Sequence, residues 1–398
     1  MSDLCARPAV STSAKPIRVA LLTDSDVFAG TERHMLDLAL GLRELGAAPT
    51  LSAPQRAQIA VRGALEALPM LPIEKGGLFD PRAIQILHRA LRRGQFDVLH
   101  AHNGRTHLSA ALAVMLARRG ACVFTQHFIE PGHTRGGGAR KAAFERVHHL
   151  TNARSHRFIA ISGAVSAAMT ARGDAPTHRI VVVPNGIGDL GETSLKLCPT
   201  TRERYGVAAD APLLLCVARL ATEKDHATLL EAFAGVRRAF PNARLWLAGD
   251  GALKNEMKRQ IEALHLSEAV QMLGFVAEVP VLIAAADALV LPAPREPFGL
   301  VFLEAMALQK PVVACRGGAA PEIIVEGETG LLFSPHSPSE LQQALEHLMH
   351  YPSQAKQMGK AGRERFLSHF TRDLMAQRTL DVYRQAMSAT RFAVGGAA

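Results

Sequence analysis

The chain has 398 residues, of which 48% are apolar and 20% charged, an ordinary composition for a globular protein with length for two cores. No run of about 18 uncharged apolar residues is present, which excludes a membrane-spanning helix. The five cysteines are scattered without a CxxC pair, which argues against a disulfide framework or a zinc site. Residues 1–16 lack an apolar core of signal-peptide length, so we expect a disordered lead-in and a cytoplasmic protein.

Short β-branched runs alternate with helical patterns, and this alternation occurs twice along the chain. It predicts an α/β protein with two Rossmann-like domains, each a parallel sheet with helices on both faces. In the first domain, residues 17–190, we expect strands at 17–23, 97–102, 121–126, 157–161 and 180–183. Helices are expected between them at 31–45, 81–93, 105–119, 139–153 and 164–172.

The stretch that follows contains Gly191 and Pro199 and looks irregular, so we place an interdomain linker at residues 191–203. The alternation then restarts in a second domain, residues 204–371. Strands are expected at 212–217, 243–248, 270–272, 288–291 and 311–314. Helices are expected at 225–239, 252–264, 279–285, 299–308, 338–350 and 353–370.

Part of the formal net charge of +9 is concentrated between residues 130 and 160. The basic residues there are Arg135, Arg140, Lys141, Arg146, Arg154 and Arg157. No aromatic-interleaved or finger-like motif accompanies them, so nucleic acid is not the expected partner. Anionic lipid headgroups on the inner face of a membrane, or a phosphate-bearing acceptor, fit the charge better. A solvated basic face without a partner remains the alternative.

Residues 296–304 are the most informative segment, because Glu304 is the only charged side chain between Phe298 and Leu308. This apolar run predicts a buried helix, and a buried carboxylate is costly unless hydrogen bonds reach it. Helix N-termini attract phosphate, and five residues of helix rise about 7.5 Å. A diphosphate at Gly299–Val301 could therefore carry a ribose that reaches Glu304. A structural glutamate paired with an arginine remains the alternative.

Two acids separated by seven residues in this context resemble the signature of family 4 glycosyltransferases, retaining enzymes of the two-domain GT-B architecture. Further segments agree with the family in order, namely Val183-Pro184-Asn185-Gly186-Ile187, Val217-Ala218-Arg219-Leu220 with Glu223-Lys224, and Gly317-Gly318 with Pro321-Glu322 and Gly327-Glu328-Thr329-Gly330. The resemblance covers roughly residues 17–385. It implies two domains facing across a cleft, and a final helix within residues 372–390 that packs back on the first domain.

The resemblance also implies roles for single residues. Arg219 and Lys224 would hold the donor diphosphate, the arginine as a planar fork and the lysine as a point charge. Glu296 would contact hydroxyls of the donor sugar, and Glu304 the ribose of the nucleotide. The implied catalytic set is His127, Glu296, Arg219 and Lys224. The implied donor-binding set is Gly30, Arg219, Lys224, Gly249, Phe275, Glu296, Phe298, Gly299, Leu300, Val301 and Glu304.

The first domain supplies the opposing wall of the expected site. Gly30 opens a helix after the first strand and would let backbone approach phosphate, with Thr31 or Glu32 as the cap. His127 follows a strand and resembles a family histidine that positions the transferred sugar. His100 and His102 lie on one strand face and could suggest a metal. We expect hydrogen-bonding roles for them, because no third ligand with suitable spacing is visible.

Three other interpretations compete. Asp24-Ser25-Asp26 matches the DxD metal motif of the other large glycosyltransferase architecture; we interpret it as a polar turn and expect no cofactor and no essential metal. A nicotinamide-dependent oxidoreductase would need Gly-x-Gly-x-x-Gly after a strand, which neither residues 28–32 nor 249–253 provide. A non-catalytic GT-B subunit that only binds a nucleotide sugar stays open, and turnover with any acceptor would exclude it.

The sequence therefore predicts a retaining glycosyltransferase that uses a nucleotide-diphosphate sugar and a glycan or lipid-linked acceptor. Bacterial envelope polysaccharide or lipopolysaccharide assembly is the setting that the resemblance implies. The sugar, the base and the acceptor are left open.

Overall fold

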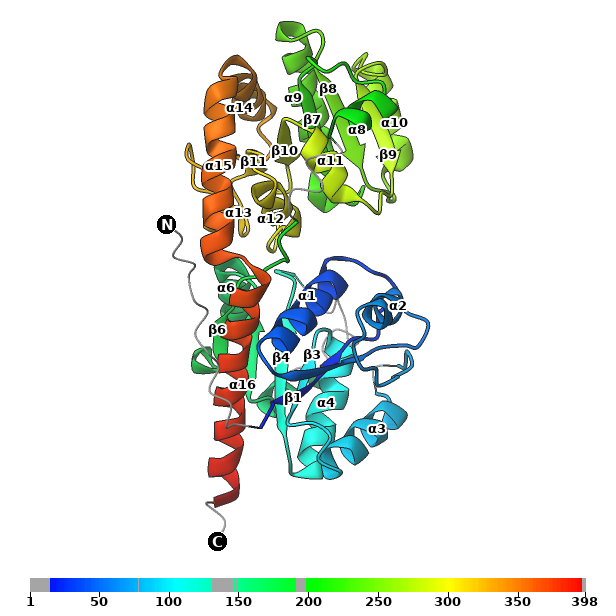
Figure 1. Ribbon diagram of the computed structural model, residues 1–398, viewed down its shortest axis with the longest axis vertical. Coiled ribbons are helices and arrows are strands. Elements are labelled where there is room, and N and C mark those ends of the chain that lie inside the picture. Colours follow the sequence, from blue (N-terminus) through cyan, green and yellow to red (C-terminus); the bar gives the residue numbers. More distant parts are fainter. Residues whose placement is uncertain are drawn as a thin grey trace, which may run out of the picture.

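The computed structural model describes residues 15–77, 79–130, 146, 147, 149, 151–190 and 198–395. Figure 1 shows two domains along the long axis of the molecule, the first half of the chain below and the second half above. Each domain is built around a six-stranded sheet of described strands, and all of the strand pairs are parallel. The predicted fold class, two Rossmann-like domains of the GT-B type, is confirmed.

The first sheet has the strand order β2-β1-β3-β4-β5-β6. Its strands are β1 (Arg18–Leu22), β2 (Ala48–Ser52), β3 (Val98–Ala101), β4 (Ala121–Gln126), β5 (Arg157–Ala160) and β6 (Ile180–Val182). The helical elements of this half are α1 (Gly30–Glu44), α2 (Gln58–Leu65), α3 (Pro81–Arg92), α4 (Gly104–Ala117), α6 (Gly163–Arg172) and the 3-10 turn η2 (Thr177–Arg179).

Alternate residues of β1 explain the layers of this domain. Ala20 and Leu22 belong to the apolar cluster that includes residues of α3 and α4. Val19 and Leu21 belong to a second cluster, which includes residues of α1 and of the C-terminal helix α16 (Arg372–Gly395). Successive side chains of a strand point to opposite faces, so the sheet is buried on both sides.

The second sheet has the order β12-β11-β10-β7-β8-β9. Its strands are β7 (Leu213–Val217), β8 (Arg244–Ala248), β9 (Val270–Gly274), β10 (Ala288–Leu291), β11 (Val312–Cys315) and β12 (Gly330–Phe333). The helical elements are α8 (Cys198–Arg204), η3 (Thr222–Lys224), α9 (His226–Ala239), α10 (Lys254–Ala263), α11 (Val279–Ala285), α12 (Leu300–Ala307), α13 (Ala320–Ile323), α14 (Pro338–His350) and α15 (Pro352–His369).

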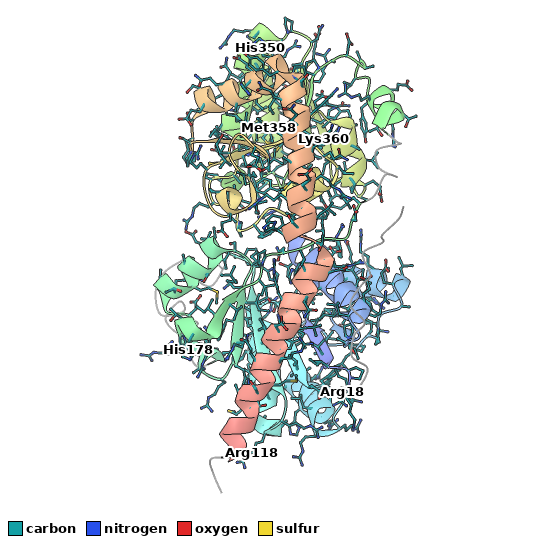
Figure 2. The ribbon with its side chains drawn as sticks, turned by 60° about the vertical axis from the view of Figure 1, so that its left-hand side comes forward. Arg18, Arg118, His178, His350, Met358 and Lys360 are labelled. Atoms are coloured by element: carbon teal, nitrogen blue, oxygen red, sulfur yellow. The ribbon has the colours of Figure 1, made fainter. Side chains whose placement is uncertain are left out.

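The chain crosses between the domains twice, and the two crossings lie side by side. Ile187 N donates to Phe370 O at 3.2 Å, and Arg372 N donates to Ile187 O at 2.8 Å. A Cβ on Gly186 would lie 2.2 Å from Thr371 O, so only glycine permits this approach. After the second crossing α16 runs along the first domain, and Figure 2 shows it following α15, which the labelled Met358 and Lys360 mark.

Several elements differ from the sequence-based expectation. The edge strands β2 and β12 were not predicted, nor were the short helices α2 and α13. Edge strands tolerate Pro and are short, and Pro49 in β2 and Gly330 in β12 weaken the strand pattern. Helix α8 occupies residues that we placed in the linker. The predicted helix 139–153 lies largely outside the described residues, as does most of the basic stretch at 130–160.

Candidate active site

The carboxyl ends of β7 and β10, which pair in the second sheet, bring two predicted residues together. Lys224 lies in η3 beyond β7, and Glu296 lies in the loop between β10 and α12. Lys224 Nζ is 2.5 Å from Glu296 Oε2, and the two side chains are only 18% and 10% exposed. Ligands of open α/β sheets bind at this end of the strands, so this ion pair marks the candidate site.

Two glycines, Gly317 and Gly318, let the segment after β11 approach the backbone of the loop that carries Glu296. A Cβ on Gly318, which has φ +56, would lie 2.1 Å from Glu296 O, and one on Gly317 would lie 2.0 Å from Pro294 O. Ala319 N donates to Glu296 O at 2.8 Å. The Gly317-Gly318 pair thus permits a close backbone approach that any larger residue would prevent.

The Arg219 guanidinium extends toward solvent from the same region. Its side chain is 68% exposed and forms an ion pair with Glu223, four residues on. Exposed ion pairs contribute little stability, so Arg219 can leave Glu223 for a better anion. The structure therefore puts the two predicted cations in different states, Lys224 paired within the site and Arg219 at its edge.

Glu304 lies on α12, and among the described residues none donates a hydrogen bond to its carboxylate. Burial raises the pKa of Glu304 to about 7, the Arg33 guanidinium opposes this rise, and the Asp37 carboxylate adds to it. Arg33 Nε donates to Asp37 at 2.9 Å, so this arginine already has a carboxylate partner. Arg33 is therefore the candidate partner if Glu304 is a structural acid. The oxygens of Glu304 can still accept hydrogen bonds from a ligand.

The first domain approaches the start of α12. Helix α1 begins at Gly30, and Glu32 caps it by accepting from Ala29 N at 3.1 Å. A Cβ placed on Gly30 would have Leu300 Cδ1 as its nearest neighbour, at 3.9 Å. Two predicted donor-binding positions, one from each domain, therefore face each other. Gly299, at φ +87, is the N-cap of α12 and leads into Leu300 and its half-buried neighbour Val301.

Three other predicted donor-binding residues, Phe298, Gly249 and Phe275, differ in packing and exposure. The Phe298 side chain is 3% exposed and packs edge-on against Phe370, so only its backbone is available to a ligand. Gly249 lies so close to Ala218 O that a Cβ would be 1.9 Å away, which explains glycine there without a ligand. The Phe275 ring is 75% exposed at the end of the edge strand β9. It is free to stack on a flat ligand.

A cluster of three histidines corrects one expectation. The sequence showed no third ligand for the His100 and His102 strand, but α1 supplies His34 and β4 is followed by His127. The ligand atoms of His34, His102 and His127 all lie within 4.8 Å of one another. His102 Nδ1 is 3.1 Å from His127 Nε2. His100 is bound separately, by Tyr383 of α16 and by Thr125, each at 2.7 Å.

The imidazoles of this cluster are neutral at neutral pH. Burial lowers the pKa of His34 to about 4. The pKa values of His102 and His127 lie well below their ordinary value through burial and the neighbouring imidazoles. Neutral imidazoles can ligate a transition metal, and three histidines are a known zinc ligand set even though no carboxylate or thiolate of the described residues belongs to this cluster. Neutral imidazoles can also donate hydrogen bonds to hydroxyl groups and accept hydrogen bonds from them.

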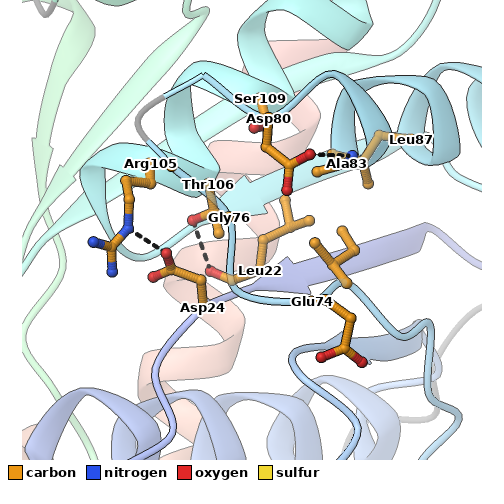
Figure 3. A pocket seen from close by; sticks show the side chains of 12 residues that line it. Leu22, Asp24, Glu74, Gly76, Asp80, Ala83, Leu87, Arg105, Thr106 and Ser109 are labelled. Carbon is orange, nitrogen blue, oxygen red and sulfur yellow. Dashed lines mark hydrogen bonds and ion pairs between the residues drawn. The ribbon is translucent and has the colours of Figure 1, made fainter.

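The Asp24-Ser25-Asp26 turn follows β1, and Asp24 contacts Asn103, the chain neighbour of His102. Asp24 pairs with Arg105 and accepts from Asn103 at 2.8 Å, and Asp26 pairs with Lys75 at 2.7 Å. Figure 3 shows Asp24 and Arg105 beside a recess that contains none of the predicted donor-binding residues. The partners of both acids agree with the interpretation as a polar turn.

Sequence reasoning missed the residues that join the domains near Glu296. Ser162, the N-cap of α6, donates to Pro297 O at 2.8 Å, and Glu322 accepts from the first amides of α6. Ser162 carries an ordinary N-cap signal, a serine before a helix, and this signal says nothing about a partner in another domain. Glu322 was visible only as part of the family pattern.

No helix in the described residues is both long and apolar enough to cross a bilayer.

Comparisons with known proteins agree with this geometry. The model of glycosyl transferases group 1 matches residues 199–365, and that of glycosyltransferase family 4 matches residues 28–189. A glycogen synthase of Mycobacterium tuberculosis is 30% identical over 74% of this chain and 70% of its own length. The putative glycosyltransferase EpsD of Bacillus subtilis is 28% identical over 80% of this chain and 84% of its own.

Among solved structures, Anabaena HepE in complex with UDP superposes with a TM-score of 0.78 at 23% identity, over 92% of this chain and 99% of its own. A glycosyltransferase from Rickettsia africae gives a TM-score of 0.79 at 19% identity, over 94% and 99%. Matches that together span both domains, with a curated relative at 30% identity, show that the chain belongs to glycosyltransferase family 4 and is a glycosyltransferase.

Proposed function

We propose that this protein is a retaining glycosyltransferase that moves a sugar from a nucleotide-diphosphate sugar to a glycan or a lipid-linked acceptor. The observation that carries the proposal is the Lys224–Glu296 ion pair beside the start of α12, with the acceptor oxygens of Glu304 on the same helix. A cation, a helix N-terminus and a carboxylate in this order suit a diphosphate followed by a ribose.

In this proposal the donor diphosphate binds at the start of α12, between Arg219 and Lys224. Negative charge grows on the diphosphate as the sugar departs, and preorganised cations lower the barrier by stabilising it. Glu304 accepts hydrogen bonds from the ribose hydroxyls. Glu296 accepts from hydroxyls of the sugar and lies near the developing oxocarbenium charge. No step needs a metal ion.

The first domain supplies the groups that face the transferred sugar. His127 is neutral, so it can donate to a sugar hydroxyl with one ring nitrogen while His102 occupies the other. Gly30 leaves room for the donor beside Leu300. The acceptor enters from the side of this domain.

Similar proteins support a nucleotide donor and a role in polysaccharide synthesis. Anabaena HepE has been solved with UDP and with UDP-glucose. One structural neighbour is the lipopolysaccharide outer core galactosyltransferase WaaB, with a TM-score of 0.65 at 16% identity. We therefore propose bacterial cell-envelope polysaccharide or lipopolysaccharide biosynthesis as the setting.

A panel of nucleotide sugars in a thermal-shift assay tests the donor. A donor at a hundred times its dissociation constant should stabilise the folded protein by about 2.7 kcal/mol. The same shift should be lost in Lys224→Ala and kept in Lys258→Ala, a control for charge removal at an exposed position on α10. Absence of a shift with every nucleotide sugar contradicts the proposal. Binding without transfer to any acceptor would favour a non-catalytic subunit.

A further inference from the structure

The start of α6 in the first domain is occupied by a carboxylate from the second. Glu322 Oε2 accepts from Gly163 N and Glu322 Oε1 accepts from Ala164 N, each at 2.7 Å. A Cβ on Gly163 would lie 3.2 Å from both carboxylate oxygens, so the fit is close. The first amides of a helix have no partner within the helix and carry partial positive charge, which suits a carboxylate.

Ser162 makes a second contact at the same helix start. Its hydroxyl accepts from Val165 N at 3.1 Å, as an N-cap, and donates to Pro297 O at 2.8 Å. The hydroxyl has one proton and two lone pairs, so both bonds can form together. Ser162 is 1% exposed, and its partner Pro297 directly follows Glu296 in the chain.

Both contacts lead to the backbone of Glu296. Ala319 N, three residues before Glu322, donates to Glu296 O at 2.8 Å. On the other side of Glu296, Arg295 forms an ion pair with Glu130 of the first domain. The loop that carries Glu296 is therefore attached to the first domain before and after this residue.

Helix α15 fixes the segment that carries Glu322 within its own domain. Arg365 donates to Glu322 O at 2.9 Å and to Ile323 O at 2.8 Å. The Glu322 side chain itself is exposed, so water can replace its bonds to α6. The backbone of Glu322 is held in place, whereas water can compete for its carboxylate. The contact between Glu322 and α6 can therefore break when the domains separate and form again when they approach.

We propose that Ser162 and Glu322 are positioning residues for sugar transfer, which hold the loop of Glu296 in its working orientation only while the first domain is docked against it. The inference rests on the proposed role of Glu296 at the donor sugar. The start of α12 and Glu304 belong to the second domain alone, so nucleotide binding should depend little on this contact. Turnover should depend on it.

Four variants test the inference in the full-length protein. Ser162→Ala removes the hydroxyl, and Ser162→Thr restores one. Glu322→Gln keeps the shape but removes the charge. Ser337→Ala is the matched control, because Ser337 caps α14 in the same way without reaching the other domain. Calorimetry measures the affinity of each variant for UDP, and a transfer assay with UDP-glucose measures kcat and KM. If another nucleotide sugar gives the largest thermal shift, that sugar and its nucleoside diphosphate replace UDP-glucose and UDP.

The expected pattern separates binding from turnover. Loss of one neutral, buried hydrogen bond should lower kcat about 5–10-fold in Ser162→Ala, and loss of the water-competed charged bonds about 2–5-fold in Glu322→Gln. Nucleotide affinity should change less than about twofold in both, and Ser162→Thr should recover turnover. Hydrogen exchange in the first turn of α6 should be faster in Glu322→Gln, whatever the donor is.

The outcomes distinguish the two proposals. Wild-type protein that binds and transfers no nucleotide sugar overturns the proposed function and this inference with it. Wild-type turnover together with variants that behave like Ser337→Ala overturns the inference alone. Equal losses of kcat and nucleotide affinity, or unchanged exchange at the start of α6 in Glu322→Gln, also count against it, because the contact would then be merely structural or absent in solution.

Discussion

Replacing Glu304 by glutamine should stabilise the unliganded protein and weaken nucleotide binding at the same time. Burial raises the pKa of Glu304 from its ordinary value of 4.5 to about 7. Between these values the folded protein retains a proton that the unfolded chain has released, so the free energy of unfolding falls as pH rises through this window. Above pH 7 the full penalty is present.

The size of the penalty follows from the two pKa values. A difference of about 2.5 pH units, at about 1.36 kcal/mol for each, gives an upper limit of about 3.4 kcal/mol. Since the carboxylate keeps some access to solvent, we expect about 1–3 kcal/mol. Glu304→Gln has no charge to bury, and should raise the melting temperature at pH 8 by roughly 3–10 °C for a domain of this size. At pH 5 the two proteins should melt within about 2 °C of each other.

Binding should change in the opposite direction. Two ribose hydroxyls lose a charged acceptor, worth roughly 1.5–3 kcal/mol, so nucleotide affinity should fall about 10–100-fold at pH 8. In wild-type protein the affinity should decline below pH 7, because protonation removes the charged acceptor, and this decline should be smaller in Glu304→Gln. The difference between the two proteins cancels the titration of the nucleotide itself.

Scanning calorimetry at pH 5 and pH 8, with nucleotide titrations at both, measures all of these quantities. Glu328→Gln, at an exposed position, controls for the general loss of a negative charge. Parallel pH dependences of the melting temperature in wild type and Glu304→Gln would refute the burial argument. Unchanged nucleotide affinity in Glu304→Gln would refute the ribose assignment.

Three further predictions concern the donor, the chemistry and the membrane. Arg219→Ala should reduce turnover about 10²-fold or more, by analogy with the loss of one oxyanion donor, and Arg219→Lys should not fully restore it because the bidentate fork is lost; wild-type rates in Arg219→Ala would contradict this. Transfer should retain the anomeric configuration by product NMR and proceed in excess EDTA, whereas activity that requires added manganese would revive Asp24 and Asp26 as ligands. If the basic residues at 130–160 contact anionic lipid, at about 1 kcal/mol for each basic residue near the surface, flotation with anionic liposomes should weaken at high salt; equal behaviour with neutral liposomes would remove the idea.

The sequence alone determined the central strands of the two sheets and where those strands end. Buried parallel strands are short, nearly continuous apolar runs, so β7 and β10 were recognisable without any neighbour. Arg219 lies two residues after the end of β7, and Glu296 lies five residues after the end of β10. The buried charge of Glu304 was also predictable from the sequence, because the apolar helix and its charged residue belong to the same short segment.

Only the tertiary structure decided which groups from distant segments meet. Edge strands such as β2 depend on pairing with a neighbour more than on their own pattern. His34 lies near His102 and His127 because α1 packs beside the ends of β3 and β4. The spacing of the three histidines along the chain does not predict this cluster. The bonds of Ser162 and Glu322 cross between domains that fold around separate sheets. Local periodicity reports which side of an element is buried, whereas the partner on that side is set by how the domains pack.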